Sequence, residues 1–172
     1  MGRQSAFLAA SAATGSRPGW AEAHSNLANV RLEQGRPAEA IRHGEEAVRL
    51  DPRFAEARLN LGNALAQTGQ WTAALASYEE ALRLKPDDAD AANNLGNVLV
   101  ELGRLPEAIG RYERALQLKP DYADARRNLA AVLAHLGRLP EASAHLRAYL
   151  HLRPDDQAAR AELARLQALT RP

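Results

Sequence analysis

The sequence repeats itself every 34 residues, and this period limits the folds open to the chain more than any other feature. Prolines, glycines and alanines all recur at this step: Pro52, Pro86, Pro120 and Pro154; Gly35, Gly69, Gly103 and Gly137; Ala40, Ala74, Ala108 and Ala142. A fixed period of this length is typical of stacked repeats, in which one unit cannot bury its apolar face without its neighbours. We therefore expect an array of similar units.

Each unit has the pattern of two helices joined by a tight turn. In the unit 89–122, apolar residues recur at spacings of three and four, which predicts a first helix over about 89–102. Gly103 can take the left-handed conformation that ends a helix, and Pro106 suits the first turn of the next one. Pro120 then ends the second helix. We predict an all-α solenoid with four repeats: 21–54, 55–88, 89–122 and 123–156.

Partial units flank the four repeats. Aligning Pro18 with Pro52 places Ala6 and Ala13 on small-residue positions of a second helix, so the segment 1–20 is expected to hold one truncated helix, 4–15, and a turn. Arg3 before an apolar run also resembles a short signal peptide, although we favour the truncated helix. The segment 157–172 carries charge all round and is expected to form a capping helix. The array then contains about ten helices.

Composition argues against several classes of function. Lys and Arg number 22 against 21 Asp and Glu, a net charge of +1, so no basic surplus indicates nucleic acid. Cysteine is absent, which removes thiol chemistry, and no apolar run approaches the ~20 residues of a membrane span. The five histidines lack metal-site spacing, and no phosphate loop or nucleophile motif occurs. We expect no enzyme activity, no metal and no cofactor, with the cytoplasm as the default compartment.

The repeat pattern resembles that of the tetratricopeptide repeat (TPR) family. The family's Leu-Gly pair, later aromatic, small residues and closing proline lie on Leu95-Gly96, Tyr112, Ala108, Ala115 and Pro120, and the resemblance covers about 21–156. It departs at the family's early aromatic position, which holds His24, Arg58, Ala92 and Arg126. Phrases such as NLGNVL and GRLPEAI are most similar to the arrays of O-GlcNAc transferase-type proteins. The resemblance implies a right-handed superhelix whose first helices line a concave groove for peptides or partner helices.

Asparagines at the sixth and ninth positions of the repeats form the sharpest polar pattern. They lie three residues apart, on one helix face: Asn26, Asn29, Asn60, Asn63, Asn94, Asn97 and Asn128. Asn costs a helix roughly half a kcal/mol relative to Ala, so some gain should offset it. Its amide has a donor and an acceptor that match the backbone of an extended peptide, which makes these residues candidate peptide ligands. Alternatively, they bridge adjacent helices or were copied when one unit was duplicated.

Carboxylates recur at the second position of each repeat: Glu22, Glu56, Asp90 and Asp124. They either complement the positive end of a helix dipole or form an acidic rim that favours a basic ligand. Arg127 and His135 interrupt the acidic trend in the last repeat. The family's clamp for a C-terminal carboxylate is disfavoured, because its lysine position holds Ser25, Leu59 or Asn93.

We therefore expect a protein-interaction scaffold that binds an extended peptide or a partner helix through the asparagines. Leu32, Leu59 and Val100 are candidates for an apolar floor of the groove. Neither nucleic acid nor a membrane is expected as a partner. Two alternatives stay open: the substrate-presenting arm of a larger enzyme such as a glycosyltransferase, and a structural array that self-associates through its terminal repeats.

Overall fold

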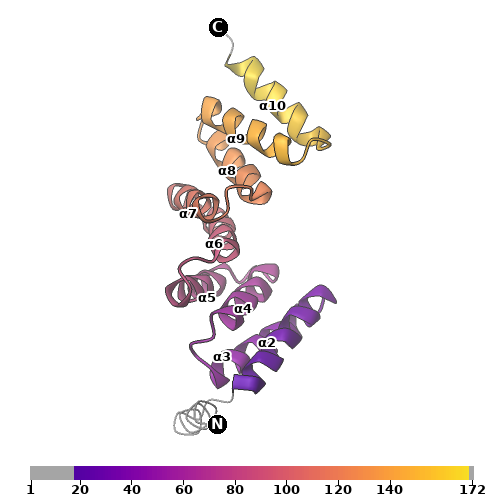
Figure 1. Ribbon diagram of the computed structural model, residues 1–172, viewed down its shortest axis with the longest axis vertical. Helices are drawn as coiled ribbons and strands as arrows, with labels where there is room; N and C mark the ends of the chain where they lie inside the picture. The colour runs from indigo at the N-terminus through magenta and orange to yellow at the C-terminus, as the bar shows by residue number, and fades with distance from the viewer. Residues whose placement is uncertain (1–17, 171–172) are drawn as a thin grey trace, which may run out of the picture. The chain divides into compact units, whose positions relative to one another are not determined.

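The computed structural model describes residues 18–170, and all the regular structure in this range is helical (Figure 1). Its α-helices, in chain order, are α2 (Pro18–Glu33), α3 (Pro37–Leu50), α4 (Ala55–Gln67), α5 (Trp71–Leu84), α6 (Ala89–Glu101), α7 (Leu105–Leu118), α8 (Ala123–His135), α9 (Leu139–Leu152) and α10 (Gln157–Leu169). The all-α fold that the sequence predicts is confirmed. The further helix expected at 4–15 lies outside the described residues.

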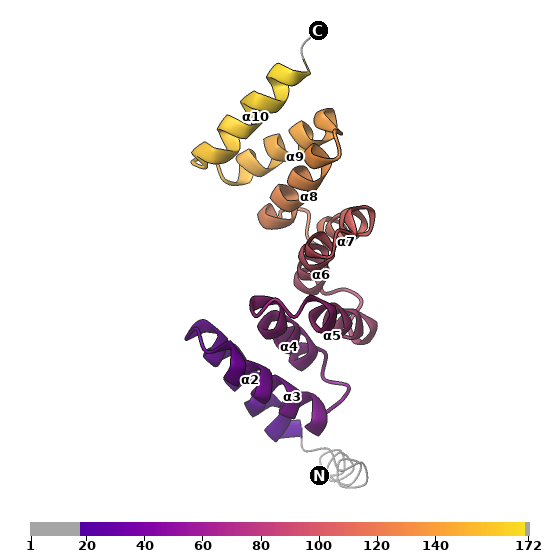
Figure 2. The ribbon, with the colours of Figure 1, turned by 180° about the vertical axis from the view of Figure 1, so that it is seen from behind.

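Two compact units divide the chain after Pro86. Unit 1 contains α2 to α5, and unit 2 contains α6 to α10. Within each unit the helices pair in chain order as antiparallel hairpins, α2 with α3 and α4 with α5, then α6 with α7 and α8 with α9, with α10 on α9 (Figures 1 and 2). The first helices of neighbouring hairpins also touch, α2 with α4 and α6 with α8. Each unit is thus a short stack of helix-turn-helix repeats.

Glycine ends the first helix of every repeat, as the sequence predicts. The four turn glycines, at 35, 69, 103 and 137, have φ angles between 69° and 75°, a backbone conformation that favours glycine. In the third repeat Arg104 N–H donates to Leu99 O at 2.8 Å, which satisfies a carbonyl of the last turn. Proline in the first turn then starts α3, α7 and α9.

Helix boundaries follow the repeat period closely. Helices α4, α6, α8 and α10 begin at residues 55, 89, 123 and 157, where the sequence places the starts of repeats 2 to 4 and of the cap. Helix α2 is different, because it begins at Pro18 rather than at residue 21. Over residues 18–170, none of the helices has both the length and the hydropathy that crossing a membrane requires.

Candidate functional site

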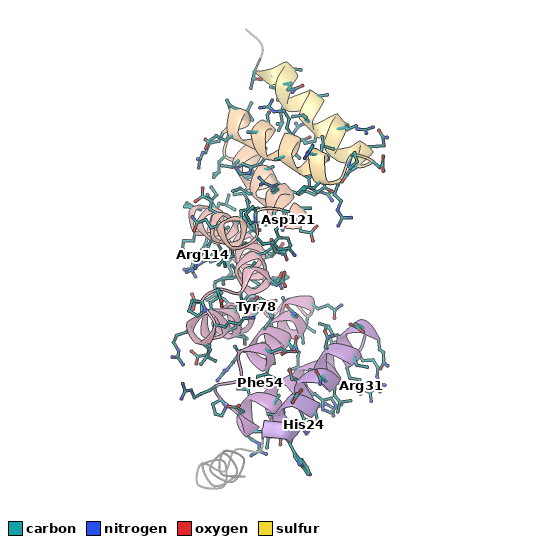
Figure 3. The ribbon with its side chains drawn as sticks, viewed as in Figure 1. His24, Arg31, Phe54, Tyr78, Arg114 and Asp121 are labelled. Atoms are coloured by element: carbon teal, nitrogen blue, oxygen red, sulfur yellow. The ribbon has the colours of Figure 1, made fainter. Side chains whose placement is uncertain are left out.

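Tyrosine hydroxyls on the second helices hold two of the ninth-position asparagines. Tyr78 OH donates to Asn63 Oδ1 at 2.7 Å, and Tyr112 OH donates to Asn97 Oδ1 at 2.8 Å; Figure 3 labels Tyr78. Burial raises the pKa of both tyrosine hydroxyls, so each keeps its proton and stays a donor. These bonds tie α4 to α5 and α6 to α7. They also fix which way each asparagine amide faces.

In unit 2, the Tyr112 bond leads to an ordered pair of asparagines, which we call the amide pair: Asn97 on α6 and Asn128 on α8. Asn128 Nδ2 donates to Asn97 Oδ1 at 3.0 Å and to Oδ1 of the buried Asn93 at 3.1 Å. Asn97 Nδ2 and Asn128 Oδ1 then have no partner within residues 18–170. The amide pair therefore presents one free donor and one free acceptor, both held in place.

The equivalent positions in unit 1 are Asn29 on α2 and Asn60 on α4, and they do not form such a pair. Gly44 stands where the third repeat has Tyr112, so no hydroxyl is available to hold Asn29. Asn29 Nδ2 instead donates to Glu33 Oε1 at 3.1 Å on its own helix. Asn60 Nδ2 donates to Ser25 Oγ at 2.9 Å. Tyr112 in place of Gly44 therefore distinguishes the third repeat from the first, whereas Tyr78 of the second repeat, in unit 1, holds Asn63.

The other predicted site residues are dispersed over the first helices. Asn94 Oδ1 accepts a bond from Asn93 Nδ2 at 3.2 Å, and Asn26 is exposed on α2. The four second-position carboxylates are exposed; those at 56, 90 and 124 lie in the first turn of their helices. Burial and then a hydrogen bond to Asp90 raise the pKa of Tyr122. The exposure and first-turn placement of these carboxylates fit both interpretations, dipole partner and acidic rim, so both stay predictions.

A cavity of about 380 Å³ lies beside the amide pair, between α6 and α8. Val100 and Ala131 line it, and each lies three residues after one member of the pair, so the cavity begins one helical turn beyond the free donor and acceptor. Its other lining residues are Gly103, Leu105, Val132 and His135. The apolar floor that the sequence suggests at Leu32, Leu59 and Val100 stays a prediction. We call this space the α6–α8 cavity.

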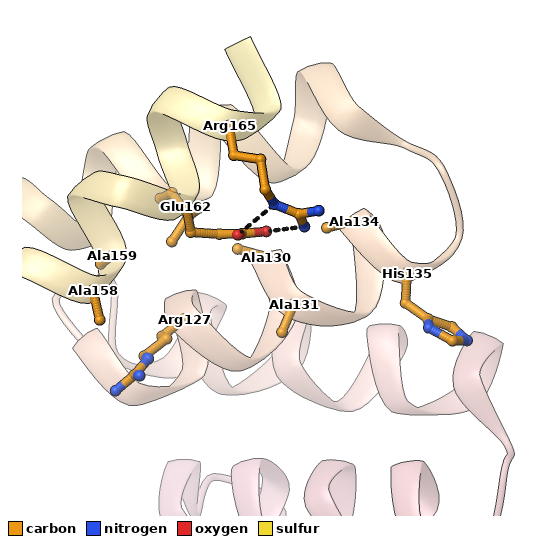
Figure 4. A pocket seen from close by; sticks show the side chains of 10 residues that line it. Arg127, Ala130, Ala131, Ala134, His135, Ala158, Ala159, Glu162 and Arg165 are labelled. Carbon is orange, nitrogen blue, oxygen red and sulfur yellow. Dashed lines mark hydrogen bonds and ion pairs between the residues drawn. The ribbon is translucent and has the colours of Figure 1, made fainter. Parts of the chain in front are cut away.

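A second cavity of about 410 Å³ lies on the other side of α8, between α8 and α10 (Figure 4). Leu146 of α9 lines it together with five alanine side chains, those of residues 130, 131, 134, 158 and 159. Arg127 and His135 lie at its two sides in Figure 4, and a Glu162–Arg165 ion pair at 2.7 Å borders it. Ala131 and His135 line both cavities. The hollow surface of unit 2 therefore continues from α6 across α8 to α10.

Several of these features are not evident from the sequence. The main residue that sequence reasoning missed is the buried Asn93, which accepts a bond from Asn128 of the next repeat. Ser25, at the same fifth position of its repeat, likewise accepts a bond from Asn60. A polar residue at the fifth position is therefore the sequence feature that could have indicated this role. The cavity against α10 has no repeat-based signal, because α10 lies outside the four full repeats. Residues 18–170 hold no group of three or more His, Asp or Glu side chains placed to bind a metal ion.

Comparison with protein families agrees with this architecture. A model described as TPR repeat matches three overlapping segments, 28–69, 62–103 and 96–137, which together cover more than half of the chain. The chain belongs to the TPR family.

Solved structures similar to this chain include several TPR proteins. One is YrrB, described as a TPR protein with an unusual peptide-binding site, at 27% identity and a TM-score of 0.73, over 85% of this chain and 75% of that one. Another is TTC0263, a thermophilic TPR protein from Thermus thermophilus, at 28% identity and a TM-score of 0.71, over 86% and 81%. MamA is similar at 28% identity and a TM-score of 0.74, over 78% of each chain. Comparison with curated proteins finds no match. The narrower resemblance to O-GlcNAc transferase-type arrays stays a prediction.

Proposed function

We propose that this protein is an interaction scaffold whose unit 2 binds an extended segment of a partner protein at the amide pair. One observation carries the proposal: internal bonds from Tyr112 and to Asn93 leave Asn97 Nδ2 and Asn128 Oδ1 as a free donor and a free acceptor at fixed positions. An extended peptide offers the complementary groups, a carbonyl and an N–H, at every residue other than proline. The pair therefore suits backbone recognition.

The energetics favour a pair that is ordered before the ligand arrives. A neutral hydrogen bond contributes only about 0.5–1.5 kcal/mol net, so ordering a loose side chain on binding would offset much of it. The amide pair avoids this cost, because α6, α7 and α8 already hold it. Asn29 and Asn60 lack this arrangement, so we assign the main contact to unit 2 and a weaker one to unit 1.

The α6–α8 cavity adds side-chain selectivity to backbone recognition. A peptide whose backbone bonds to the amide pair would place a neighbouring side chain over Val100 and Ala131. The cavity volume of about 380 Å³ falls within the range of about 300–1,000 Å³ typical of ligand sites. Val100, Leu105 and Val132 make its wall largely apolar. We therefore expect the ligand to carry a large apolar residue next to the residue that bonds to the pair.

The similarity to YrrB supports this function, because that TPR protein is described as having a peptide-binding site. We propose secondary contacts along the first helices from the second-position carboxylates and from four further asparagines: Asn29, Asn60, Asn63 and Asn94. Asn26 is not among the proposed contacts. The exposed carboxylates would favour basic residues in the ligand near Asp90 and Asp124.

The test begins with a ligand selected without bias. Linear random peptides of about ten residues, roughly 33 Å when extended, are displayed on phage and selected on the whole chain. Binding of a selected synthetic peptide is then measured calorimetrically with the wild type and with Asn97→Asp. The aspartate keeps one oxygen for Tyr112 and Asn128, but it replaces the free Nδ2 donor with an acceptor. We expect affinity to fall about tenfold or more, since a repelled carbonyl costs more than a lost bond.

The matched control is Asn26→Asp, which makes the same charge change at an exposed asparagine of unit 1. It should alter affinity by less than about twofold, because a single exposed charge is screened by solvent and salt. Equal losses in the two variants would indicate a general charge effect. Unchanged affinity in Asn97→Asp would contradict the proposed site.

A further inference from the structure

The second cavity of unit 2, which we call the α8–α10 cavity, lies where the repeat period would place another amide pair. The positions 34 residues after Asn97 and Asn128 hold Ala131 and Glu162. Alanine has no group that could bond across to α10. Glu162 is held on its own helix, because Arg165 donates two hydrogen bonds to it, at 2.7 and 2.8 Å. The first helices therefore enclose a hollow of about 410 Å³ here instead of a hydrogen-bonded bridge.

Small apolar side chains give this cavity its volume. Ala134 lies where the third repeat has the larger Val100, and it lines the α8–α10 cavity with four other alanines and Leu146 (Figure 4). Leu146 is only 5% exposed, so the cavity reaches an apolar wall. The volume falls within the range of about 300–1,000 Å³ that is typical of ligand sites. A large apolar side chain therefore suits the cavity.

Arg127 places a positive charge at one side of the α8–α10 cavity. Its guanidinium lies 3.8 Å from Asp156 Oδ2 and 5.9 Å from the centre of the Tyr149 ring, and its side chain is 55% exposed. Asp156 already accepts bonds from Tyr149 OH at 2.6 Å and from Ala159 N–H at 2.9 Å. Within residues 18–170, Arg127 itself donates no hydrogen bond. Residues of α9 and α10 thus orient the guanidinium, while its N–H donors stay available to a ligand.

The other charged pair beside the cavity does not offset Arg127. Glu162 and Arg165 line the cavity and neutralise each other through their two bonds. The charge that remains at the cavity is therefore positive, and it complements a carboxylate. A guanidinium that donates to a carboxylate forms one of the stronger kinds of hydrogen bond in proteins.

We propose that the α8–α10 cavity receives a large apolar side chain of the peptide that bonds to the amide pair, and that Arg127 binds an acidic side chain beside it. This inference rests on the proposed function and names its class of ligand. Ala131 lines both cavities, so a peptide that crosses α8 passes from one to the other. Packed helices lie about 8–10 Å apart, a distance that about three extended residues cover. The ligand then has two large apolar residues about three positions apart, with an acidic residue next to the second.

The acidic contact is tested with the peptides selected on the whole chain. They are synthesised with amidated C-termini, so that side chains supply every carboxylate. We expect an acidic residue beside a large apolar one in these peptides. Changing that acidic residue to its amide, or Arg127→Gln in the protein, should each lower affinity about three- to tenfold, and both together should cost little more than either alone.

Arg111→Gln is the matched control for the charge change. Arg111 is exposed on α7 and lines neither cavity, so its loss should couple to the peptide's acidic residue by less than about twofold. Additive losses with Arg127→Gln, or selected peptides without an acidic residue, would overturn the assignment of Arg127.

Filling the cavity from α10 tests the apolar contact. Ala158 lines the α8–α10 cavity but not the α6–α8 cavity, and Ala161, exposed on the same helix, lines neither. Ala158→Leu should lower affinity at least about tenfold and Ala161→Leu by less than about twofold, because only the first occupies space that the ligand needs. Shortening the second apolar residue of the peptide to alanine should remove most of this difference. A dimer in light scattering that Ala158→Leu dissociates would mean that a second copy fills the cavity, which overturns the proposal.

Comparison with Asn97→Asp separates this inference from the proposed function. Weaker binding in Asn97→Asp, with unchanged affinity in both Ala158→Leu and Arg127→Gln, would overturn the inference and leave the amide pair as the site. Weaker binding in Ala158→Leu and Arg127→Gln, with unchanged affinity in Asn97→Asp, would support the cavity and contradict the amide pair. We expect all three variants to bind a selected peptide less tightly than the wild type does.

Discussion

The ring of Tyr112 fills the space beside Gly96, so closely that a Cβ on the glycine would lie 2.5 Å from Cε1 of the ring. Gly62 and Tyr78 have the same relationship in the second repeat, at 2.6 Å. In the fourth repeat Ala130 replaces the glycine and Leu146 replaces the tyrosine, so a larger first-helix residue faces a smaller second-helix residue. The glycine therefore makes room for a particular aromatic ring, and this ring in turn holds Asn97.

Replacing Gly96 with alanine should destabilise unit 2. Alanine gains about 1 kcal/mol of helix propensity, but overpacking costs about 1–3 kcal/mol, and the Tyr112 hydroxyl bond hinders the ring from turning away. Chemical denaturation should show a net loss of about 1 kcal/mol. Gly110→Ala is the matched control: nothing lies within 4 Å of its added Cβ, so the unfolding free energy should rise by about 0.5–1 kcal/mol.

The combination seen in the fourth repeat should relieve the clash in the third. Gly96→Ala together with Tyr112→Leu recreates the Ala130–Leu146 arrangement, so the loss in the double variant should be smaller than the sum of the two single losses by about 1 kcal/mol. A double-mutant cycle of unfolding free energies measures this coupling. Strictly additive losses would show that ring and glycine do not constrain each other.

Removing the Tyr112 hydroxyl should weaken peptide binding without removing any group that touches the peptide. In Tyr112→Phe the Asn97 amide loses its anchor and resembles Asn29, so we expect affinity for a selected peptide to fall about two- to tenfold. Calorimetric titration measures the change. Tyr78→Phe removes the equivalent hydroxyl from unit 1 and should cost similar stability; if it weakened binding equally, preorganisation of the amide pair would not be the cause.

Filling the hollow on α8 should block binding and leave the fold intact. Ala131 is exposed and lines both cavities, so Ala131→Leu places a larger side chain in each of them. We expect peptide affinity to fall by at least about tenfold, with the thermal midpoint changed by no more than about 2 °C. Ala76→Leu, an exposed position on α5, controls for added surface hydrophobicity. Tight binding to Ala131→Leu would place the peptide elsewhere.

Unit 1 should become less stable as the pH falls below neutrality. His24 Nδ1 and His43 Nδ1 lie 3.0 Å apart, and Figure 3 labels His24 on α2. Burial, and then His24, lower the pKa of His43; Arg31 and Arg42 act in the same direction, and Glu39 opposes them. The unfolded chain therefore takes up a proton near its usual pKa of about 6.5 while folded His43 resists it, so stability decreases as the pH drops through and below that value.

Thermal unfolding between about pH 7.5 and about pH 5 checks this direction. His43→Gln keeps a hydrogen-bonding partner for His24 but does not titrate, so the pH dependence should become shallower. It should not vanish, because burial also lowers the pKa of His145 in unit 2. An unchanged slope in His43→Gln would exclude the histidine pair as its source.

The helices and turns were predictable because each depends on local chemistry repeated at a fixed step. Gly103 ends α6, Pro106 lies in the first turn of α7, and α6 begins at Ala89, as the period requires. Only α2 departs, with its start at Pro18.

The site was less predictable, because an asparagine's amide faces whichever partners its neighbours supply. Asn29 and Asn97 both hold the ninth position of a repeat, yet their hydrogen-bond partners differ. Tyr112 donates to Asn97, whereas Gly44 in the first repeat has no hydroxyl to offer, and Asn29 bonds to Glu33 instead. The two sequence hypotheses, contact with ligand and bridges between helices, also prove compatible. In the amide pair, one edge of each amide bridges helices and the other edge stays free.

The side-chain amide of Asn97 provides the most direct test of the proposed binding site. Nuclear magnetic resonance resolves side-chain N–H groups, and the signals that Asn97→Asp removes identify those of Asn97. On titration with a selected peptide, they should shift downfield in proportion to occupancy, because Asn97 Nδ2 donates to a peptide carbonyl, while the Asn26 signals stay in place. Saturation of the protein with peptide and no shift at Asn97 would contradict the account.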